Sequence, residues 1–433
     1  MNNVITNEGD AISYIHQLPR LHRKNDLSYV KRALAYFANP QDKIKTIHIT
    51  GTNGKGSTSY YLNSLLQKAG FKTGLFVSPF ITEFNERIQI NSKNIAGTDL
   101  VSLTKRVAAA VADLAGQTSG TEEEFILTEF EFLVVMAFVY FAEQKVDFAI
   151  IEAGIGAKHD KTNVITPLVS IITSVGMDHE QLIGPTLLDI AAEKSGIIKN
   201  SVPVVVGRLS PDVLKLIRAT AKKRAAPLAV FGRNFVVQEH SQTSFSYENW
   251  SDKTMLNFRM RPTVEQIDVA IAVTAFKIVY DQLSEHQIEA AIDETQIVGR
   301  YQVLRQSPKV IADGAHNVQA MTNFYGYLKS LVAGDATRIH FLLIMMKDKD
   351  LHEVLELISA SDITLTTIDY PRAAKRADFV AAGLGDIKFE PDFKIAYKNL
   401  EQNVAPDDII AISGSFYFVT DFLNYMRKTE DDK

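Results

Sequence analysis

The chain of 433 residues is too long for a single hydrophobic core, so two or three domains are expected. Its apolar content of 46% and charged content of 22% are those of an ordinary globular protein, and a formal net charge of -5 argues against a nucleic-acid-binding surface. The absence of cysteine excludes disulfides and thiolate metal sites, and it fits the cytoplasmic location that we expect.

No secretion signal or membrane span is expected. Residues 1–10 are polar and acidic, without the apolar core of a signal peptide. The longest apolar run, residues 132–142, lies between Glu131 and Glu143 and is too short to cross a bilayer. We interpret this run as a buried helix.

Strand-like runs alternate with helical patterns between residues 46 and 208, which favours a parallel sheet covered on both faces. The predicted strands are 45–50, 72–78, 146–152, 168–175 and 202–207, and the predicted helices are 55–69, 99–115, 128–144 and 185–194. The last helix is expected to begin at Pro185. Residues 228–260 alternate aromatic and polar side chains, which is typical of a small antiparallel addition.

A second alternating series follows a predicted helix at 263–283 and the polar stretch 293–296, where we place the domain boundary. Its predicted strands are 309–313, 338–345, 363–369 and 408–413, and its predicted helices are 317–331, 350–359 and 416–427. The expected fold class is therefore α/β, with a parallel-sheet ATPase domain containing a phosphate loop, followed by a smaller Rossmann-like doubly wound domain.

Residues 50–57 read Thr-Gly-Thr-Asn-Gly-Lys-Gly-Ser and join a predicted strand to a predicted helix. Glycines at such a turn let main-chain amides approach phosphates, and the helix start adds partial positive charge. Lys55 is placed to reach terminal phosphates and Ser57 a bound magnesium, although Gly56 separates them, unlike in the common pattern. A turn that merely connects two elements is the alternative, and we favour a nucleotide site.

Polar side chains follow three further predicted strands: Ser78, Glu152 and His179. The carboxyl ends of parallel strands share one edge of a sheet, where ligands bind. A hydroxyl, a carboxylate and an imidazole beside the phosphate loop predict a site for a hard cation shared with ATP. Singly, they could be a cap, a solvated strand end and a loop histidine; their common edge favours the metal site.

Lys194 lies in the last turn of its predicted helix and has two interpretations. Its charge can offset the negative helix end. A desolvated amine can instead take up CO2 as a carbamate, which would turn a cation into an anionic metal ligand. The spacing does not choose between them.

Together these residues resemble the folylpolyglutamate synthase and dihydrofolate synthase family, part of the Mur-ligase-like superfamily of ATP-dependent amide-forming enzymes. The matching segments run in order along nearly the whole chain and are 50–57, 78–79, 86–88, 128–131, 152–163, 178–179, 193–197, 299–300, 313–317, 348–350, 371–373 and 414–417. Each segment alone has low specificity, whereas their order and spacing are highly specific.

The resemblance implies an ATP-binding domain at 1–295 and a C-terminal ligase domain at 299–433. It implies ATP contacts at Gly54, Lys55, Gly56, Ser57, Arg300 and Asp313, magnesium ligands at Ser78, Glu152, His179 and a carboxylated Lys194, and substrate contacts at Phe80, Arg87 and Thr128. It also implies catalytic roles for Lys55, Asp160, Lys194, His316 and Ser415, with His316 and Ser415 at the glutamate site between the domains.

The same resemblance implies ATP, Mg²⁺ and a monovalent cation such as K⁺ as cofactors. The expected partners are small molecules, namely a folate or dihydropteroate and L-glutamate, with no nucleic acid and no membrane, and a monomer is expected. The chain departs from the family pattern at Phe80, Ala157, Lys158, Lys161, Glu265 and Val269. Phe80 stands where histidine is common, and Val269 replaces an asparagine that contacts the nucleotide.

The sequence thus predicts a ligase that adds L-glutamate to the terminal carboxylate of a folate through an acyl phosphate. One alternative is dihydrofolate synthase, alone or as a second activity. Another is a non-catalytic nucleotide- or folate-binding paralog, which Lys161 and Val269 would support. A ligase for cell-wall precursors is disfavoured, because we expect no separate domain before the phosphate loop.

Overall fold

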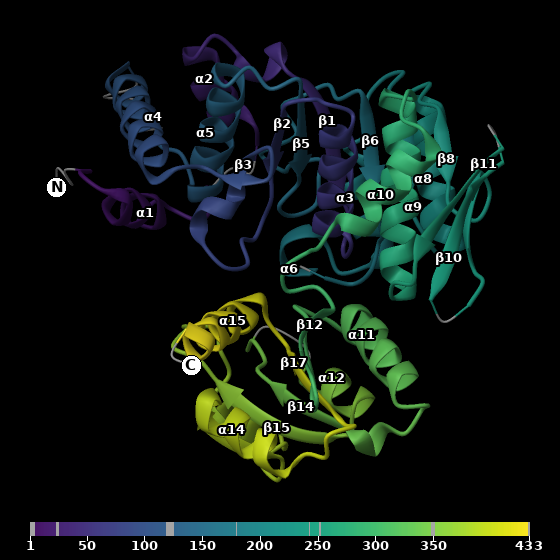
Figure 1. Cartoon of the computed structure of the whole chain (residues 1–433). Coiled ribbons are helices and arrows are strands. Elements are labelled where there is room, and N and C mark those ends of the chain that lie inside the picture. Colours follow the sequence, from purple (N-terminus) through teal and green to yellow (C-terminus); the bar gives the residue numbers. More distant parts are fainter. Residues whose placement is uncertain are drawn as a thin grey trace. The chain divides into compact units, whose positions relative to one another are not determined.

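The computed structural model describes residues 5–22, 26–117, 125–178, 180–241, 243–250, 253–347 and 351–431. The chain divides into two compact units, Met1–Thr295 (unit 1) and Gln296–Lys433 (unit 2). Unit 1 is coloured purple through green in Figure 1, and unit 2 green through yellow.

Unit 1 is built on an eight-stranded sheet in the order β4-β3-β2-β5-β1-β6-β7-β8. Its strands are β1 (Lys45–Thr50), β2 (Thr73–Phe76), β3 (Ile88–Ile90), β4 (Lys93–Asn94), β5 (Phe148–Glu152), β6 (Val169–Ile172), β7 (Val204–Val206) and β8 (Leu228–Val230). The six strands from β2 to β8 in this order are parallel, while β3 and β4 continue the sheet in antiparallel fashion.

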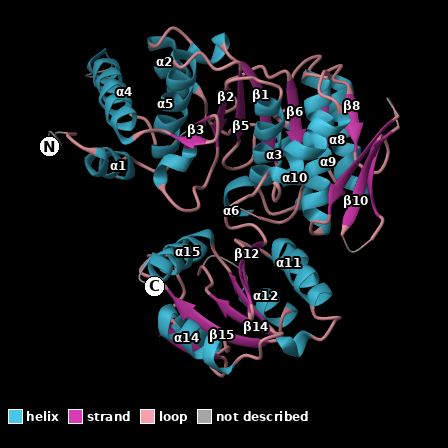
Figure 2. Cartoon of the chain, in the orientation of Figure 1, coloured by secondary structure: helices cyan, strands magenta, loops and turns pink. Residues whose placement is uncertain are grey.

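Helices cover both faces of this sheet, as Figure 2 shows. The helices of unit 1 are α1 (Glu8–His16), α2 (Ser28–Tyr36), η1 (Pro40–Lys43), α3 (Lys55–Lys68), η2 (Phe84–Arg87), α4 (Gly97–Gln117), α5 (Glu129–Glu143), α6 (Glu180–Ile183), α7 (Leu187–Ser195), α8 (Pro211–Lys223), α9 (Thr263–Val279) and α10 (Glu285–Glu294). Phe76 and Ile151 join the core under α5, while Val204 and Val206 join the core under α7 and α8. On the opposite face α3 packs against β2 and β5, and α9 against β6 and β7. Because each strand is covered twice, its apolar run is continuous.

The predicted antiparallel addition is confirmed in part. Strands β9 (Phe235–Glu239), β10 (Ser244–Asn249) and β11 (Thr254–Arg259) form a separate antiparallel sheet in the order β11-β10-β9. Residues 228–230, however, form β8 and pair in parallel with β7. This strand supplies hydrogen-bond partners to the main chain of β7, whose residues are fully buried.

Several predicted helix bounds are wrong. The last helix of the chain, for example, ends at Asp431 rather than at residue 427. Helix α7 begins at Leu187 rather than Pro185, because the Thr186 side chain caps the helix by accepting a hydrogen bond from the Asp189 amide. Helix α9 ends at Val279 rather than at residue 283.

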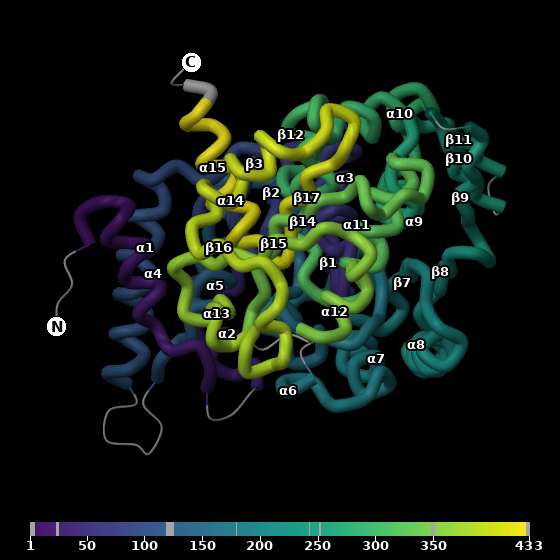
Figure 3. Tube along the Cα trace, turned by 90° about the horizontal axis from the view of Figure 1, so that it is seen from below, coloured from purple at the N-terminus to yellow at the C-terminus, as the bar shows by residue number. Residues whose placement is uncertain are grey.

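Unit 2 contains a six-stranded sheet in the order β12-β13-β17-β14-β15-β16. Figure 3 shows its trace in green to yellow, with every strand but β13 labelled. Its elements are β12 (Gln302–Gln306), β13 (Lys309–Ala312), α11 (Val318–Leu331), η3 (Ala336–Arg338), β14 (Ile339–Leu343), α12 (Leu351–Leu357), β15 (Asp362–Thr367), α13 (Arg376–Ala381), β16 (Lys388–Asp392), α14 (Phe393–Asn403), β17 (Ile409–Ser413) and α15 (Phe416–Asp431). Only β12 runs antiparallel, at one edge. The predicted α/β class, a parallel-sheet domain followed by a smaller doubly wound one, is confirmed.

The apolar run at 132–142 lies within α5, whose residues from Glu131 to Phe141 are all buried, so the predicted buried helix is confirmed. Among the described residues, no helix is long and apolar enough to cross a membrane.

Replacing Phe141 by alanine should lower the free energy of unfolding by about 3–5 kcal/mol, because the ring is fully buried and its loss leaves a cavity. The ring packs so closely on β2 that a side chain at Gly74 would lie 2.8 Å from its Cδ1 atom. Chemical denaturation followed by circular dichroism measures the change. Lys105→Ala, on the exposed face of α4, is the control and should stay within about 0.5 kcal/mol of the parent.

Candidate functional site

The glycine-rich turn at 51–54 connects β1, which ends at Thr50, to α3, which begins at Lys55. A Cβ atom on Gly51 would lie 1.9 Å from Thr173 Oγ1, and one on Gly54 would lie 2.3 Å from Asp268 Oδ1. Gly54 also has a φ of 86°, in the left-handed region. Only glycine fits at these two positions, so the main chain is held close to its neighbours at the start of α3.

Two lysine ammonium groups converge on the carbonyl of Gly51. Lys55 Nζ donates to it at 2.9 Å and also to the Thr52 carbonyl at 3.2 Å, while Lys194 Nζ donates to the Gly51 carbonyl at 2.9 Å. Burial, and then repulsion from Lys55, lowers the pKa of Lys194 to about 7. A substantial share of the Lys194 amine is therefore neutral near pH 7.

Two of the predicted metal ligands meet beside the start of α3. Glu152, at the end of β5, is buried, and its Oε2 accepts a hydrogen bond from the Ser78 amide at 3.2 Å. A Cβ atom on Gly56 would lie 3.8 Å from the same carboxylate oxygen. The third predicted ligand, His179, and the segment 348–350 lie outside the described residues. Within the part of the chain that the structure describes, no three His, Cys, Asp or Glu residues gather as a metal cluster.

Asp160 lies in the loop after β5 and is buried. Its Oδ2 accepts from the Ile155 amide at 3.0 Å, and its Oδ1 accepts from the amide and the hydroxyl of Thr162. Burial raises the pKa of Asp160, against these hydrogen bonds. The Thr162 hydroxyl also contacts His48 Nε2 at 2.8 Å, and because its single proton goes to Asp160, His48 must donate.

Glu193 on α7 holds the middle of this loop. Its carboxylate accepts from the His159 amide at 2.8 Å and contacts His159 Nδ1 at 2.9 Å. A side chain at Gly156 would lie 2.6 Å from Glu193 Cγ, so the loop lies directly on α7.

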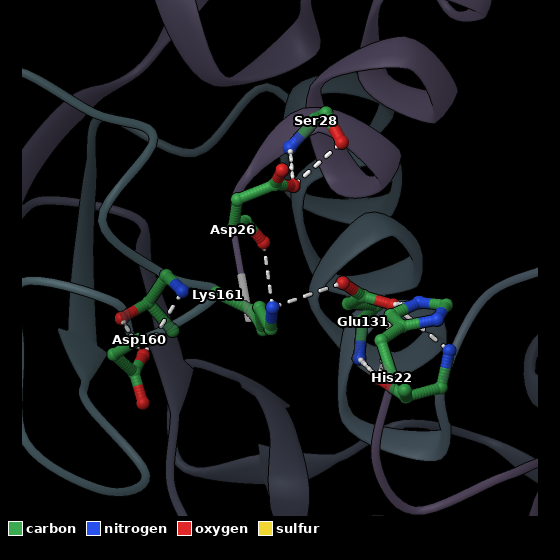
Figure 4. A network of polar contacts seen from close by, with 8 residues as sticks. His22, Asp26, Ser28, Glu131, Asp160 and Lys161 are labelled. Carbon is green, nitrogen blue, oxygen red and sulfur yellow. Dashed lines mark hydrogen bonds and ion pairs between the residues drawn. The ribbon is translucent and has the colours of Figure 1, made fainter. Parts of the chain in front are cut away.

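Lys161 holds the next part of the loop through a buried polar network (Figure 4). Its Nζ donates to the Asp26 carbonyl at 2.6 Å and lies 3.2 Å from Glu131 Oε1. The other Glu131 oxygen contacts His22 Nε2 at 2.6 Å and accepts from the Thr128 amide at 2.9 Å. The sequence identified Lys161 only as a departure from the family pattern. The capping pattern at 128–131 could have predicted the backbone contact of Glu131, whereas nothing local predicts its pairing with His22.

The three predicted substrate residues have different surroundings. The Arg87 guanidinium lies 5.1 Å from the centre of the Phe80 ring, and its Nη1 donates to Ser78 Oγ at 3.2 Å. Phe80 and Arg87 are thus adjacent to the predicted metal ligands. Thr128 is the buried N-cap of α5, and its hydroxyl is hydrogen-bonded to Glu131.

In unit 2, the predicted residues Asp313, His316 and Ser415 follow the carboxyl ends of β13 and β17. The predicted residue Arg300 precedes β12, whose first residue pairs with the end of β13. The Arg300 guanidinium lies 4.2 Å from the centre of the Phe416 ring, and the His316 ring 5.8 Å from it. Asp313 accepts from the amides of Tyr301 at 3.0 Å and Ala315 at 2.8 Å. Its burial raises its pKa, while Arg300 acts in the opposite direction.

The two departures on α9 are both buried. Val269 is fully buried, and Glu265 lies 3.9 Å from Arg261 in an ion pair. Asp268, which the sequence analysis did not identify, instead faces Gly54 from this helix.

Comparison with known proteins identifies both units. The Mur ligase middle domain matches residues 49–275, and the Mur ligase glutamate ligase domain matches residues 299–416. The dihydrofolate synthase/folylpolyglutamate synthase of Bacillus subtilis is 32% identical, covering 96% of this chain and 99% of that protein.

This chain belongs to the folylpolyglutamate synthase and dihydrofolate synthase family of Mur ligases. The folylpolyglutamate synthase of Lacticaseibacillus casei is 33% identical over 96% of this chain and 97% of its own. The apo structure of the L. casei enzyme superimposes with a TM-score of 0.84, with 31% identity over 97% of this chain and 100% of that chain. The predicted family and the predicted class of ATP-dependent ligase are confirmed.

The low pKa of Lys194 predicts a pH dependence of folding in CO2-free buffer. The unfolded lysine has a pKa of 10.5 and the folded one about 7, so between these values the unfolded chain binds the additional proton. The free energy of unfolding should therefore gain a contribution that rises from pH 7 towards pH 10.5. Denaturant titrations between these pH values should show a shallower rise for Lys194→Met, while Lys215→Met on exposed α8 should keep the parent's slope.

Lys161→Met should destabilise unit 1 by about 3 kcal/mol, because Glu131 is fully buried and loses its cationic partner. The double variant Lys161→Met with Glu131→Gln should be less destabilised than the sum of the two single variants, as measured in a double-mutant cycle by chemical denaturation. Lys43→Met is the exposed control. Strict additivity would show that the ion pair contributes nothing.

Proposed function

We propose that this chain is an ATP-dependent ligase that joins L-glutamate to the terminal carboxylate of a folate. The observation that carries the proposal is the glycine turn with Lys55, beside the buried Glu152 and Ser78, in a chain similar along nearly its whole length to folylpolyglutamate synthases. Structures of the L. casei relative hold AMPPCP, and AMPPCP with folate, at 31% identity to this chain.

The chemistry must make a carboxylate electrophilic. Oxide is a prohibitive leaving group at neutral pH, so the γ-phosphoryl group of ATP is first transferred to the folate carboxylate. The α-amine of glutamate then attacks the acyl phosphate, a tetrahedral intermediate forms, and phosphate leaves. Catalysis of phosphoryl transfer rests mainly on positioning and on electrostatic stabilisation.

The start of α3 supplies both the positioning and the electrostatic stabilisation that phosphoryl transfer needs. The main-chain amides of Gly54, Gly56 and Ser57 would surround the phosphates at the positive end of a 14-residue helix. Lys55 would exchange its carbonyl partners for phosphate oxygens and stabilise the charge on the transferred group.

The residues present fit magnesium. Ser78 and Glu152 offer a hydroxyl and carboxylate oxygens next to Gly56, and Mg²⁺ prefers such hard oxygen ligands. These two residues, with His179, would hold the ion, which neutralises phosphate charge when bound. The use of Mg²⁺, and of a monovalent cation such as K⁺, is part of this proposal.

Lys194 fits the carbamate interpretation better than the helix-end one. Its Nζ is buried and turned towards Gly51, so it does not simply face the solvent at the end of α7. A partly neutral amine with a pKa of about 7 is the form that reacts with CO2, since the nitrogen lone pair must be free. We propose that the resulting carboxylate supplies further oxygen ligands for magnesium.

We propose supporting roles for the remaining residues. Arg300 and Asp313 would bind the nucleotide, and His316 and Ser415 the glutamate. In unit 1, Phe80 and Arg87 would contact the folate. Asp160, held by Ile155 and Thr162, would position groups in the reaction. The hydroxyl of Thr128 is already used in the helix cap, so a substrate contact through it would be secondary.

Dihydrofolate synthase is the second candidate function, because the B. subtilis relative carries both names. An Escherichia coli relative, 26% identical with a TM-score of 0.85, was solved with DHPP and ADP. The same machinery would then act on dihydropteroate. We also propose that the enzyme is a monomer, which light scattering would test.

Phosphate release with ATP and glutamate, stimulated by tetrahydrofolate or by dihydropteroate, separates these functions. Tetrahydrofolate should stimulate it, and dihydropteroate only if the second function is present. Lys55→Ala should lower kcat/KM at least about 100-fold with an unchanged circular dichroism spectrum, because it removes charge stabilisation at the transferred group.

Lys68→Ala, near the far end of the same helix, is the matched control and should keep its activity. Folded protein that gives no stimulation by either pterin would instead support a non-catalytic binding protein.

A further inference from the structure

A cavity of about 650 Å³ lies in unit 1 where α7, α8, the start of α2 and the loop after β5 come together. Four cationic side chains line it: Lys31, Lys158, Lys199 and Arg224. Among the described residues that line it, there is no carboxylate and no aromatic ring. The protein as a whole carries a net charge of -5, so this concentration of positive charge does not follow from overall composition.

The second observation concerns the ionic partners of these four cations. Among the residues that the structure describes, none of the four is in an ion pair with Asp or Glu. Burial lowers the pKa of Lys199, and repulsion from Lys31 and Arg224 lowers it further. Arg224 is held in place, because its Nη1 donates to Asn200 Oδ1 at 3.0 Å. Lys31, Lys158 and Arg224 are exposed and Lys199 is half-buried, so an anion in the cavity would meet four positive charges around its wall.

The other residues that line the cavity indicate which kind of ligand fits it. Asn200, Ser195 and Thr220 add polar groups, while Leu27 and Ile198 are among the few large apolar residues. Since no ring is present to stack on a base or a pterin, the cavity suits a compact molecule rich in oxyanions. The volume exceeds that needed by a single water-sized ion.

The cavity is distinct from the phosphate loop. Ala192, Ser195 and Gly196 line it from one face of α7 and the turn that ends the helix. The amine of Lys194 is directed instead to the Gly51 carbonyl. The two sites therefore use different faces of α7.

The cavity nevertheless adjoins the loop that carries Asp160. Lys158 and Asn163, on either side of Asp160, both line it. Asn163 Nδ2 donates to the carbonyls of Lys158 at 3.2 Å and Gly196 at 3.3 Å. An anion bound here would therefore contact both the loop after β5 and the C-terminal end of α7.

We propose that this cavity is a binding site for a small polyanion carrying phosphate or carboxylate groups, separate from the nucleotide site. The proposal is independent of the ligase function proposed above. Two classes of ligand share this chemistry, oligophosphates and oligocarboxylates. A binding experiment with one compound of each class distinguishes them.

The test is calorimetric titration of the full chain, without nucleotide or magnesium and at low ionic strength, with tripolyphosphate and with tri-γ-glutamate. The parent protein should bind at least one of them, and the one it binds identifies the source. Lys199→Gln with Arg224→Gln should weaken binding at least about tenfold, because two charge-assisted contacts are lost. Lys222→Gln with Lys223→Gln makes the same charge change on exposed positions of α8 outside the cavity, and should alter affinity by less than about twofold.

Lys55→Ala separates this site from the phosphate loop, and the ligand should still bind that variant. Loss of binding in Lys55→Ala, with no loss in Lys199→Gln/Arg224→Gln, would place the ligand on the phosphate loop and overturn the proposal. If the parent protein binds neither ligand, the proposal is overturned as well. If the double variant does not fold, Lys31→Gln at an exposed position replaces it in the test. We expect this variant to bind the polyanion more weakly, and unchanged affinity would contradict the proposal.

Discussion

The close approach of the main chain at Gly51 is the constraint on which unit 1 depends. Any side chain there would overlap Thr173 on the segment after β6, and the carbonyl of the same residue accepts from two lysines on two helices. The position of α7 relative to α3 is thus fixed through a residue that has no side chain. Gly54, pressed against Asp268, fixes α9 to the same turn. A ligand at the start of α3 meets a preorganised backbone.

Three buried charged groups of unit 1 are accommodated in three ways. Asp160 is surrounded by amides and a hydroxyl, which favour the carboxylate although burial raises its pKa. Glu131 is fully buried against Lys161 and His22. Lys194 has carbonyl contact instead of an acid, and its pKa falls to about 7. The carboxylates of Asp160 and Glu131 hold the loop after β5 in place, whereas the Lys194 amine remains chemically reactive.

The parts of the fold that could be predicted are those with a strong local signal. Central strands such as β1 and β5 are continuous apolar runs, and α5 is a long apolar helix, so each was found within a few residues. The sequence analysis did not identify β12 and β16, because these edge strands are only partly buried and carry mixed residues. The short helices α1 and α10 were missed for a similar reason, since they bury few residues each. Residues 228–230 were assigned to the wrong sheet because strand pairing is a tertiary choice.

The sequence by itself determined the α/β class, the phosphate loop, the family and the strand ends near which Ser78 and Glu152 lie, because each follows from short-range pattern and motif order. Tertiary structure alone decided that Lys194 shares a carbonyl with Lys55, that Lys161 pairs with Glu131, and that four cations surround one cavity. The residues of these arrangements lie 25 to 193 positions apart in the chain. Electrostatic interaction depends on distance in space, which no local pattern encodes.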